Sequence, residues 1–196
     1  MIISDREPIV ADRRAFLRDA GLSAATISAL AFLSGPANAA AVKKAAGGSG
    51  DVGVINSALA IEHEGIAAYR LAGGSGLLSP GTLKAALVFK GHHEGHRDRL
   101  ATLVRKMGGT PVEPRADNDY VSELNLGALK TEGDVVTLAI KLEMGAANAY
   151  IGQIQALKDR ETTHIFSPIG ADEAVHWATL TAASGGSVPQ QPFIFA

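Results

Sequence analysis

The sequence predicts an all-α protein, a four-helix bundle with a long crossover between its second and third helices. In four segments, apolar residues recur at alternating steps of three and four, which places them on one face of an α-helix. Alternation at the period of a β-strand is nearly absent. The link over residues 109–131 is long and polar, which favours a crossover over a hairpin.

The composition is that of one folded domain. Of the 196 residues, 46% are hydrophobic and 19% are charged, with a net charge of -2 and no long basic run, so we expect no nucleic acid as a partner. The chain has no cysteine, which excludes disulfides, thiolate catalysis and cysteine-ligated metals. Any metal site must therefore consist of carboxylates and imidazoles.

Residues 1–39 resemble a twin-arginine export signal. Arg13 and Arg14 precede a mild apolar run over residues 20–33, and an A-x-A cleavage motif ends at Ala39. The run is shorter than the about 20 residues that span a membrane. We expect export of the folded protein by the twin-arginine machinery, cleavage near Ala39 and a periplasmic location; a membrane anchor or an amphipathic surface segment is the alternative.

The remaining chain divides into a linker, the bundle and a tail. Residues 40–52 are rich in Ala, Gly and Lys and form the expected flexible linker. The bundle is expected over residues 53–184, with Asp51 as a candidate cap of its first helix. Residues 185–196 contain two prolines and two phenylalanines and form an expected extended tail with its aromatic rings over the bundle.

Capping residues and glycines set the expected helix ends. The first helix is expected to end near Ala72, and the second to run from Pro80, capped by Ser79, to about Met107. The third helix is expected over residues 132–158. In the fourth, Pro168 interrupts the pattern, so that helix is expected to begin only with Ser167 as its cap.

A near-duplicated pattern of polar residues runs through the four helices. In each half a Glu is followed seven residues later by a Tyr, and then by two potential ligands at i and i+3 that end in His. The separations of 7, 31 and 3 in the first half become 7, 30 and 3 in the second. The residues are Glu62, Tyr69, His93 and His96 in the first half, and Glu143, Tyr150, Glu173 and His176 in the second.

The candidate ligands occupy positions in the apolar stripes of their helices, so we expect all six to point into the bundle. Burying an ionised Glu without a partner costs several kcal/mol. Three such carboxylates with three imidazoles in one interior indicate a bound cation. Ligands at i and i+3 lie on one face of a helix, where both can reach one metal.

This ligand set resembles that of the ferritin-like superfamily, in which two helices give one Glu each and two give Glu-x-x-His around paired iron or manganese ions. The resemblance covers about residues 51–184, and it is to exported single-domain members with a twin-arginine signal. It implies a ferritin-like fold and a di-iron or di-manganese site, with zinc as a further candidate. The matching positions are Glu62, His96, Glu143, Glu173 and His176.

The sequence departs from the superfamily at His93, which stands where the pattern has a Glu. A bridging carboxylate is then missing, which leaves open two metals with altered bridging, one metal, or a degenerate site. Tyr69 and Tyr150 fall where such bundles carry a tyrosine near the metals, and we expect them to contact the ligands. Glu94, next to His93, is the other candidate for that role, although it lies off the stripe.

Two classes of function remain open at this point. The first is an envelope ferroxidase or oxidoreductase that consumes dioxygen or peroxide. The second is a non-enzymatic envelope protein that binds metal for stability, storage or stress protection. Trp177 is expected to pack either between helices or at the interface of a homodimer.

Overall fold

The computed structural model describes residues 50–195, so the expected export signal and most of the linker lie outside the described residues. In this part of the chain every regular element is a helix, which confirms the predicted fold class. The four long helices are α4 (Asp51–Gly73), α5 (Pro80–Lys106), α7 (Glu132–Ile154) and α8 (Arg160–Ala183). Two short helices, α6 (Asp117–Glu123) and η2 (Leu126–Ala128), lie between α5 and α7.

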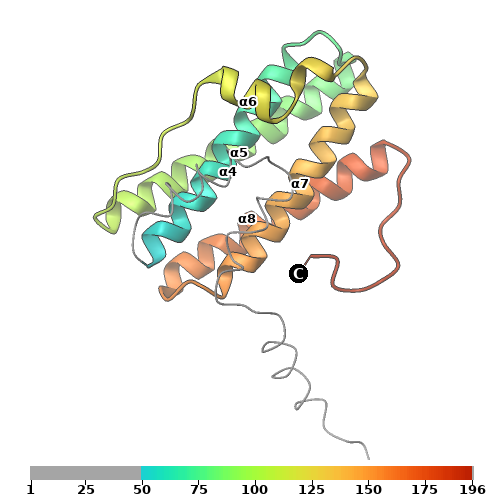
Figure 1. Cartoon of the computed structure of the whole chain (residues 1–196). Helices are drawn as coiled ribbons and strands as arrows, with labels where there is room; N and C mark the ends of the chain where they lie inside the picture. Colours follow the sequence, from blue (N-terminus) through green and yellow to red (C-terminus); the bar gives the residue numbers. More distant parts are fainter. Residues whose placement is uncertain (1–49, 196) are drawn as a thin grey trace, which may run out of the picture.

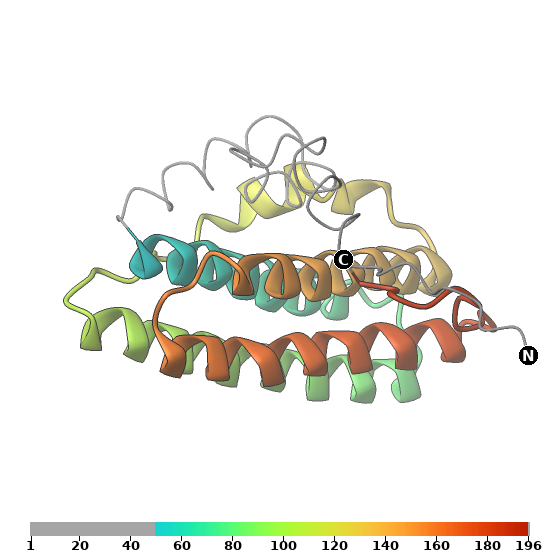
Figure 2. The same ribbon diagram turned by 90° about the horizontal axis from the view of Figure 1, so that it is seen from below.

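The long helices form two layers of two (Figures 1 and 2). Helices α4 and α7 lie side by side in one layer and α5 and α8 in the other, while α4 packs on α5 and α7 on α8 (Figure 2). The crossover carries the chain back along the bundle, so α7 starts at the end where α5 started (Figure 1). This connection gives the two halves the same arrangement around the interior.

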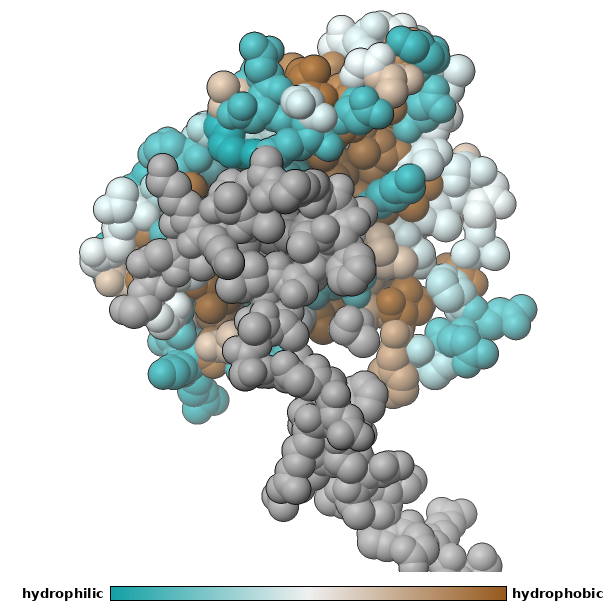
Figure 3. Space-filling view, viewed as in Figure 1, coloured by the Kyte–Doolittle hydropathy of each residue, from teal (hydrophilic) through white to brown (hydrophobic). Residues whose placement is uncertain are grey.

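The crossover is more ordered than its composition predicts. Tyr120 of α6 is 2% exposed and packs, with Leu124, on Ala67 and Ala68 of α4. The Tyr120 hydroxyl accepts a hydrogen bond of 3.1 Å from the backbone N–H of Arg115. Hydrophobic residues come to the surface between α6 and α7 (Figure 3).

The expected role of Asp51 as the cap of its own helix is wrong. Asp51 already lies in the first turn of α4, and its carboxylate accepts hydrogen bonds from the backbone N–H groups of Lys158 and Asp159. It therefore ties the start of the first helix to the link between α7 and α8. That link begins earlier than expected, because α7 ends at Ile154 rather than near Lys158.

The expected start of the fourth helix at Ser167 is also wrong. Helix α8 begins at Arg160, with Asp159 as its N-cap, and continues through Pro168. The proline ring lies on the exposed face, while the neighbouring Phe166 and Ile169 are buried against the other helices. Packing of this inner face stabilises the helix on both sides of the proline and outweighs the hydrogen bond that the proline removes.

After Ala183 the chain contains no further helix up to residue 195. One of its two phenylalanines lies over the bundle: Phe195 packs edge-on against Trp177, with ring centroids 5.3 Å apart. Phe193 points to solvent and is 88% exposed. No helix within residues 50–195 is long and apolar enough to cross a membrane.

Candidate metal centre

The six predicted ligands meet in the interior of the bundle. Helices α4 and α7 contribute one Glu each, and α5 and α8 contribute two residues each. None of the six is more than 9% exposed. The prediction that these side chains point inward together is confirmed for Glu62, His93, His96, Glu143, Glu173 and His176.

The six side chains form two overlapping groups that could each hold a metal ion. In each group, four ligand atoms lie within 4.8 Å of one another. His93 and Glu173 belong to both groups, so the two positions are adjacent. The first group is Glu62, His93, His96 and Glu173, and the second is His93, Glu143, Glu173 and His176.

Several ligand atoms in this interior have no hydrogen-bond partner. They are His96 Nδ1, His176 Nδ1, Glu143 Oε2 and both carboxylate oxygens of Glu173. His96 Nδ1 lies 3.1 Å from Glu173 Oε1, and His176 Nδ1 lies 3.4 Å from Glu143 Oε2. Leaving such atoms buried and unbonded costs about 1–3 kcal/mol each. Nitrogen and oxygen atoms that converge in this way fit a shared cation.

Two residues outside the cluster hold the far nitrogens of its histidines. Asp172 Oδ2 lies 3.2 Å from His96 Nε2, and His92 Nδ1 lies 2.9 Å from His176 Nε2. A metal-binding histidine is commonly oriented in this way through its second nitrogen. The sequence analysis missed Asp172, although its place next to Glu173 on α8 was a usable signal. His92 lies on the exposed side of α5.

Each tyrosine contacts the glutamate of the other half. The Tyr69 hydroxyl of α4 donates a hydrogen bond to Glu143 of α7, and the Tyr150 hydroxyl of α7 donates one to Glu62 of α4. Burial and the neighbouring glutamates raise the pKa of both tyrosines, so both remain protonated donors. The predicted contact of the tyrosines with the ligands is therefore present, and it is exchanged between the two halves.

His93 joins the two halves at the centre of the cluster. Its Nδ1 lies 2.8 Å from Glu62 Oε2, and its Nε2 lies 3.4 Å from Glu143 Oε1. Gly65 makes room for this ring, since a Cβ at that position would lie 3.1 Å from His93 Nδ1. A single imidazole thus lies between two carboxylates at the position where the superfamily pattern has a bridging Glu.

The carboxylates of the cluster differ in their preferred protonation. Burial alone would raise the pKa of Glu62, but the hydrogen bond from His93 and the nearby His96 ring lower it to about 2. The pKa of Glu143 is likewise lowered, against burial, by the nearby rings of His176 and His93. For Glu173, burial prevails and raises the pKa.

The imidazoles respond in the opposite direction. Burial alone would lower their pKa values, but hydrogen bonds to the carboxylates raise the pKa of His93 well above its usual value. The nearby carboxylates of Glu62, Glu143 and Glu173 likewise outweigh burial and raise the pKa of His96 to about 10 and that of His176 to about 8. In the absence of metal, the interior is therefore balanced by protons on its histidines.

Glu94 is not where the sequence analysis placed it. It was a candidate for contact with the ligands, but it turns away from the cluster and pairs with Lys90 at 2.8 Å. Its position off the apolar stripe explains this orientation. Glu64, two residues after the ligand Glu62, is 7% exposed, and its Oε2 lies 3.9 Å from Nη2 of Arg115 in the crossover.

The comparisons with known proteins agree with this fold. Residues 50–186 match the model of the ferritin-like domain family. The structure is similar to the crystal structure of a conserved hypothetical protein from Mycobacterium tuberculosis, with a TM-score of 0.61 and 22% identity, over 69% of this chain and 98% of that one. None of the proteins of curated function matches. Since the family model covers more than half of the sequence, the chain belongs to the ferritin-like domain family.

Proposed function

We propose that the interior of the bundle is a dinuclear centre for iron or manganese and that the protein is an exported metal-dependent oxidoreductase. One observation carries this proposal: two groups of four ligands share His93 and Glu173, and five of the ligand atoms are buried without a hydrogen bond. Oxygen and nitrogen donors without sulfur suit iron, manganese and zinc. Bound iron or manganese would supply the electrons that reduce dioxygen or peroxide.

The residues of the chain prepare the site for this chemistry. Asp172 and His92 orient two imidazoles so that their Nδ1 atoms face the cluster. Tyr69 and Tyr150 fix one oxygen of a glutamate each and leave its other oxygen turned toward the histidines. The dry surroundings strengthen every charge interaction within the centre.

His93 supports a second candidate function, metal binding without turnover. Two divalent cations bring four positive charges, whereas the cluster has three carboxylates. The superfamily pattern has a fourth carboxylate that balances this charge. With His93 at that position, one divalent cation such as zinc leaves less positive charge uncompensated than two cations would. A non-enzymatic envelope protein with one metal per chain is the corresponding alternative.

The first test removes single ligands. Glu143→Ala and His176→Ala each delete a buried ligand from one group, so both variants should lose metal binding by at least about tenfold, the loss expected for a weakened metal site. Glu94→Ala is the matched control, because Glu94 adjoins His93 but pairs with Lys90. Elemental analysis of protein purified after native export measures the outcome. Equal metal content in Glu94→Ala and Glu143→Ala, whether high or absent, would contradict the assignment.

The second test restores the missing carboxylate. His93→Glu adds the charge that two divalent cations lack, and it should raise the occupancy of the second metal position. His93→Gln, which is neutral and of similar length, should not. Isothermal titration with Mn2+ measures the stoichiometry. A second ion that binds as well to His93→Gln as to His93→Glu would rule out charge as the limiting factor.

The third test follows the pH dependence of stability. For His96 the pKa rises from 6.5 to about 10 on folding, and for His176 it rises from 6.5 to about 8. Their stabilising contribution is complete below pH about 6.5 and is lost as the pH rises through 8 and 10. The melting temperature of the metal-free protein should therefore fall over this window, and metal affinity should rise as protons leave the ligands.

The control for this experiment uses the exposed His164, which lies outside the cluster. His96→Gln should flatten the alkaline decline of the melting temperature, and His164→Gln should leave it unchanged. A metal-free protein whose melting temperature is constant between pH 6.5 and 10 would disprove the proton balance.

The fourth test concerns location. We propose export by the twin-arginine route because Arg13 and Arg14 precede an apolar run and a cleavage motif that ends at Ala39. Replacement of both arginines by lysine should retain the uncleaved chain in the cytoplasm, as seen by cell fractionation. Cleavage and export of the twin-lysine variant at the normal level would refute this route.

A further inference from the structure

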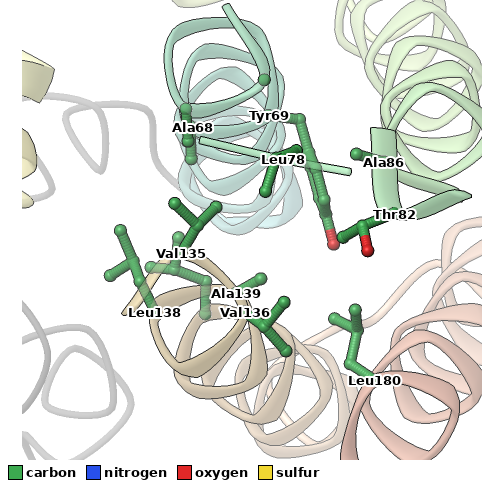
Figure 4. A pocket seen from close by; sticks show the side chains of 13 residues that line it. Ala68, Tyr69, Leu78, Thr82, Ala86, Val135, Val136, Leu138, Ala139 and Leu180 are labelled. Atoms are coloured by element: carbon green, nitrogen blue, oxygen red, sulfur yellow. The ribbon is translucent and has the colours of Figure 1, made fainter. Parts of the chain in front are cut away.

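A small apolar cavity lies between the four long helices at one end of the bundle, with a volume of about 40 Å3 (Figure 4). It lies where the C-terminal ends of α4 and α8 meet the N-terminal ends of α5 and α7. Four of its lining residues are alanines: Ala68, Ala72, Ala86 and Ala139.

The cavity lies directly beyond the metal centre along the bundle. On each long helix, one lining residue is either four or seven positions from a candidate ligand. At a rise of about 1.5 Å per residue, this spacing places the cavity roughly 6–10 Å from the ligands. The pairs of lining residue and ligand are Tyr69 and Glu62, Ala86 and His93, Ala139 and Glu143, and Leu180 and His176.

Tyr69 belongs to both the cavity and the centre. Its side chain extends into the space between the helices (Figure 4), and its hydroxyl donates the hydrogen bond to Glu143. The tyrosine thus forms the inner wall of the cavity, and an occupant in contact with its ring is one side chain away from a candidate ligand.

The lining exposes almost no polar surface to a water molecule. The only polar side chains in its lining are Tyr69 and Thr82. The Tyr69 hydroxyl already donates to Glu143, and Thr82 Oγ1 lies 3.0 Å from Ser79 Oγ. A buried water needs two to four polar partners, so a water molecule gains little in this apolar pocket, which is partly open to solvent. Peroxide, which forms hydrogen bonds like water, is disfavoured for the same reason.

The volume is suited to a very small molecule. About 40 Å3 exceeds the roughly 10–15 Å3 needed to hold one water, but it is far below the roughly 150 Å3 of an apolar cavity that accepts benzene. A diatomic molecule or a single noble-gas atom fits this range, and a ring or an acyl chain does not.

The opposite end of the bundle is filled by large side chains. There Ile55, Leu59, Leu100 and Phe166 are all fully buried and pack in one cluster. The two ends therefore differ in side-chain size, with alanines lining one end and large residues filling the other, although the ligands repeat symmetrically between the halves.

We propose that this cavity is a binding site for dioxygen, which reaches the metal centre past Tyr69. The inference rests on the metal-dependent function proposed above and deepens it, because it selects dioxygen rather than peroxide as the oxidant. An apolar diatomic molecule gives up no hydrogen bonds when it leaves water for an apolar pocket.

The cavity is tested with xenon as the probe, on the full metal-free chain. Xenon should bind in the space bounded by Tyr69 and Ala86, as located in crystals under xenon pressure and followed by 129Xe chemical shift in solution. Ala86→Leu fills the space and should abolish binding. Ala85→Leu, the same change one residue away and outside the lining, should leave binding intact.

The supply of dioxygen is tested with the iron-loaded protein. Ala86→Leu and, on another helix, Ala139→Leu should slow the oxidation of bound Fe2+ by dioxygen about tenfold, equal to a barrier raised by about 1.4 kcal/mol. Oxidation by peroxide should keep its rate, as should both reactions in Ala85→Leu. Metal content and melting temperature, measured on each variant, show that it is folded and loaded.

The outcomes separate this inference from the function on which it rests. If xenon binds in the cavity but the chain binds no metal, the gas site is supported and the proposed function is contradicted. Metal in the cluster with no xenon in the cavity overturns the gas site alone. Equal oxidation rates in Ala86→Leu and Ala85→Leu, or an equal slowing with peroxide, overturn the role in supplying dioxygen.

Discussion

The fold depends on the mutual neutralisation of charges in its interior. Three carboxylates and three imidazoles converge from four helices, in a place where a single uncompensated charge would cost several kcal/mol. His93 lies between Glu62 and Glu143, and the other histidines face the remaining carboxylate oxygens. With protons on the histidines the interior is balanced without metal, and with a cation those protons leave. The stability of the fold and the binding of metal therefore depend on the same few side-chain atoms.

Much of this arrangement could be predicted from the spacing of residues in the sequence. The 3.6-residue period fixes which side chains share a helix face, so the inward direction of Glu62 and His176 followed from their places in apolar stripes. Capping chemistry is equally local, and it gave the start of α5 at Ser79 and Pro80 correctly. The near-duplicated pattern predicted that the ligands of the two halves meet. In a bundle with one crossover, equivalent positions of the two halves lie at the same level along the bundle axis.

What depends on contacts between distant segments could not be predicted in this way. Asp51 binds the backbone at Asp159, yet no local pattern distinguishes it from a surface acid. Asp172 adjoins Glu173 in the sequence, but only the assembled bundle shows that it holds His96. Helix α8 continues through Pro168 because its inner face is packed against the other helices. The helix propensities of single residues do not include such packing. The cavity beside Tyr69 is a difference in volume between two ends of the bundle, visible only once the four helices are assembled.

The exchange of tyrosines between the halves has a consequence for how the chain is assembled. The hairpin of α4 and α5 contains Glu62 but not the hydroxyl that serves it, and the hairpin of α7 and α8 lacks the donor for Glu143 in the same way. Neither hairpin alone therefore contains the tyrosine that its own glutamate bonds to. Both hydrogen bonds form only when α7 and α8 pack against α4 and α5. A complete set of these bonds in the interior therefore requires the whole bundle.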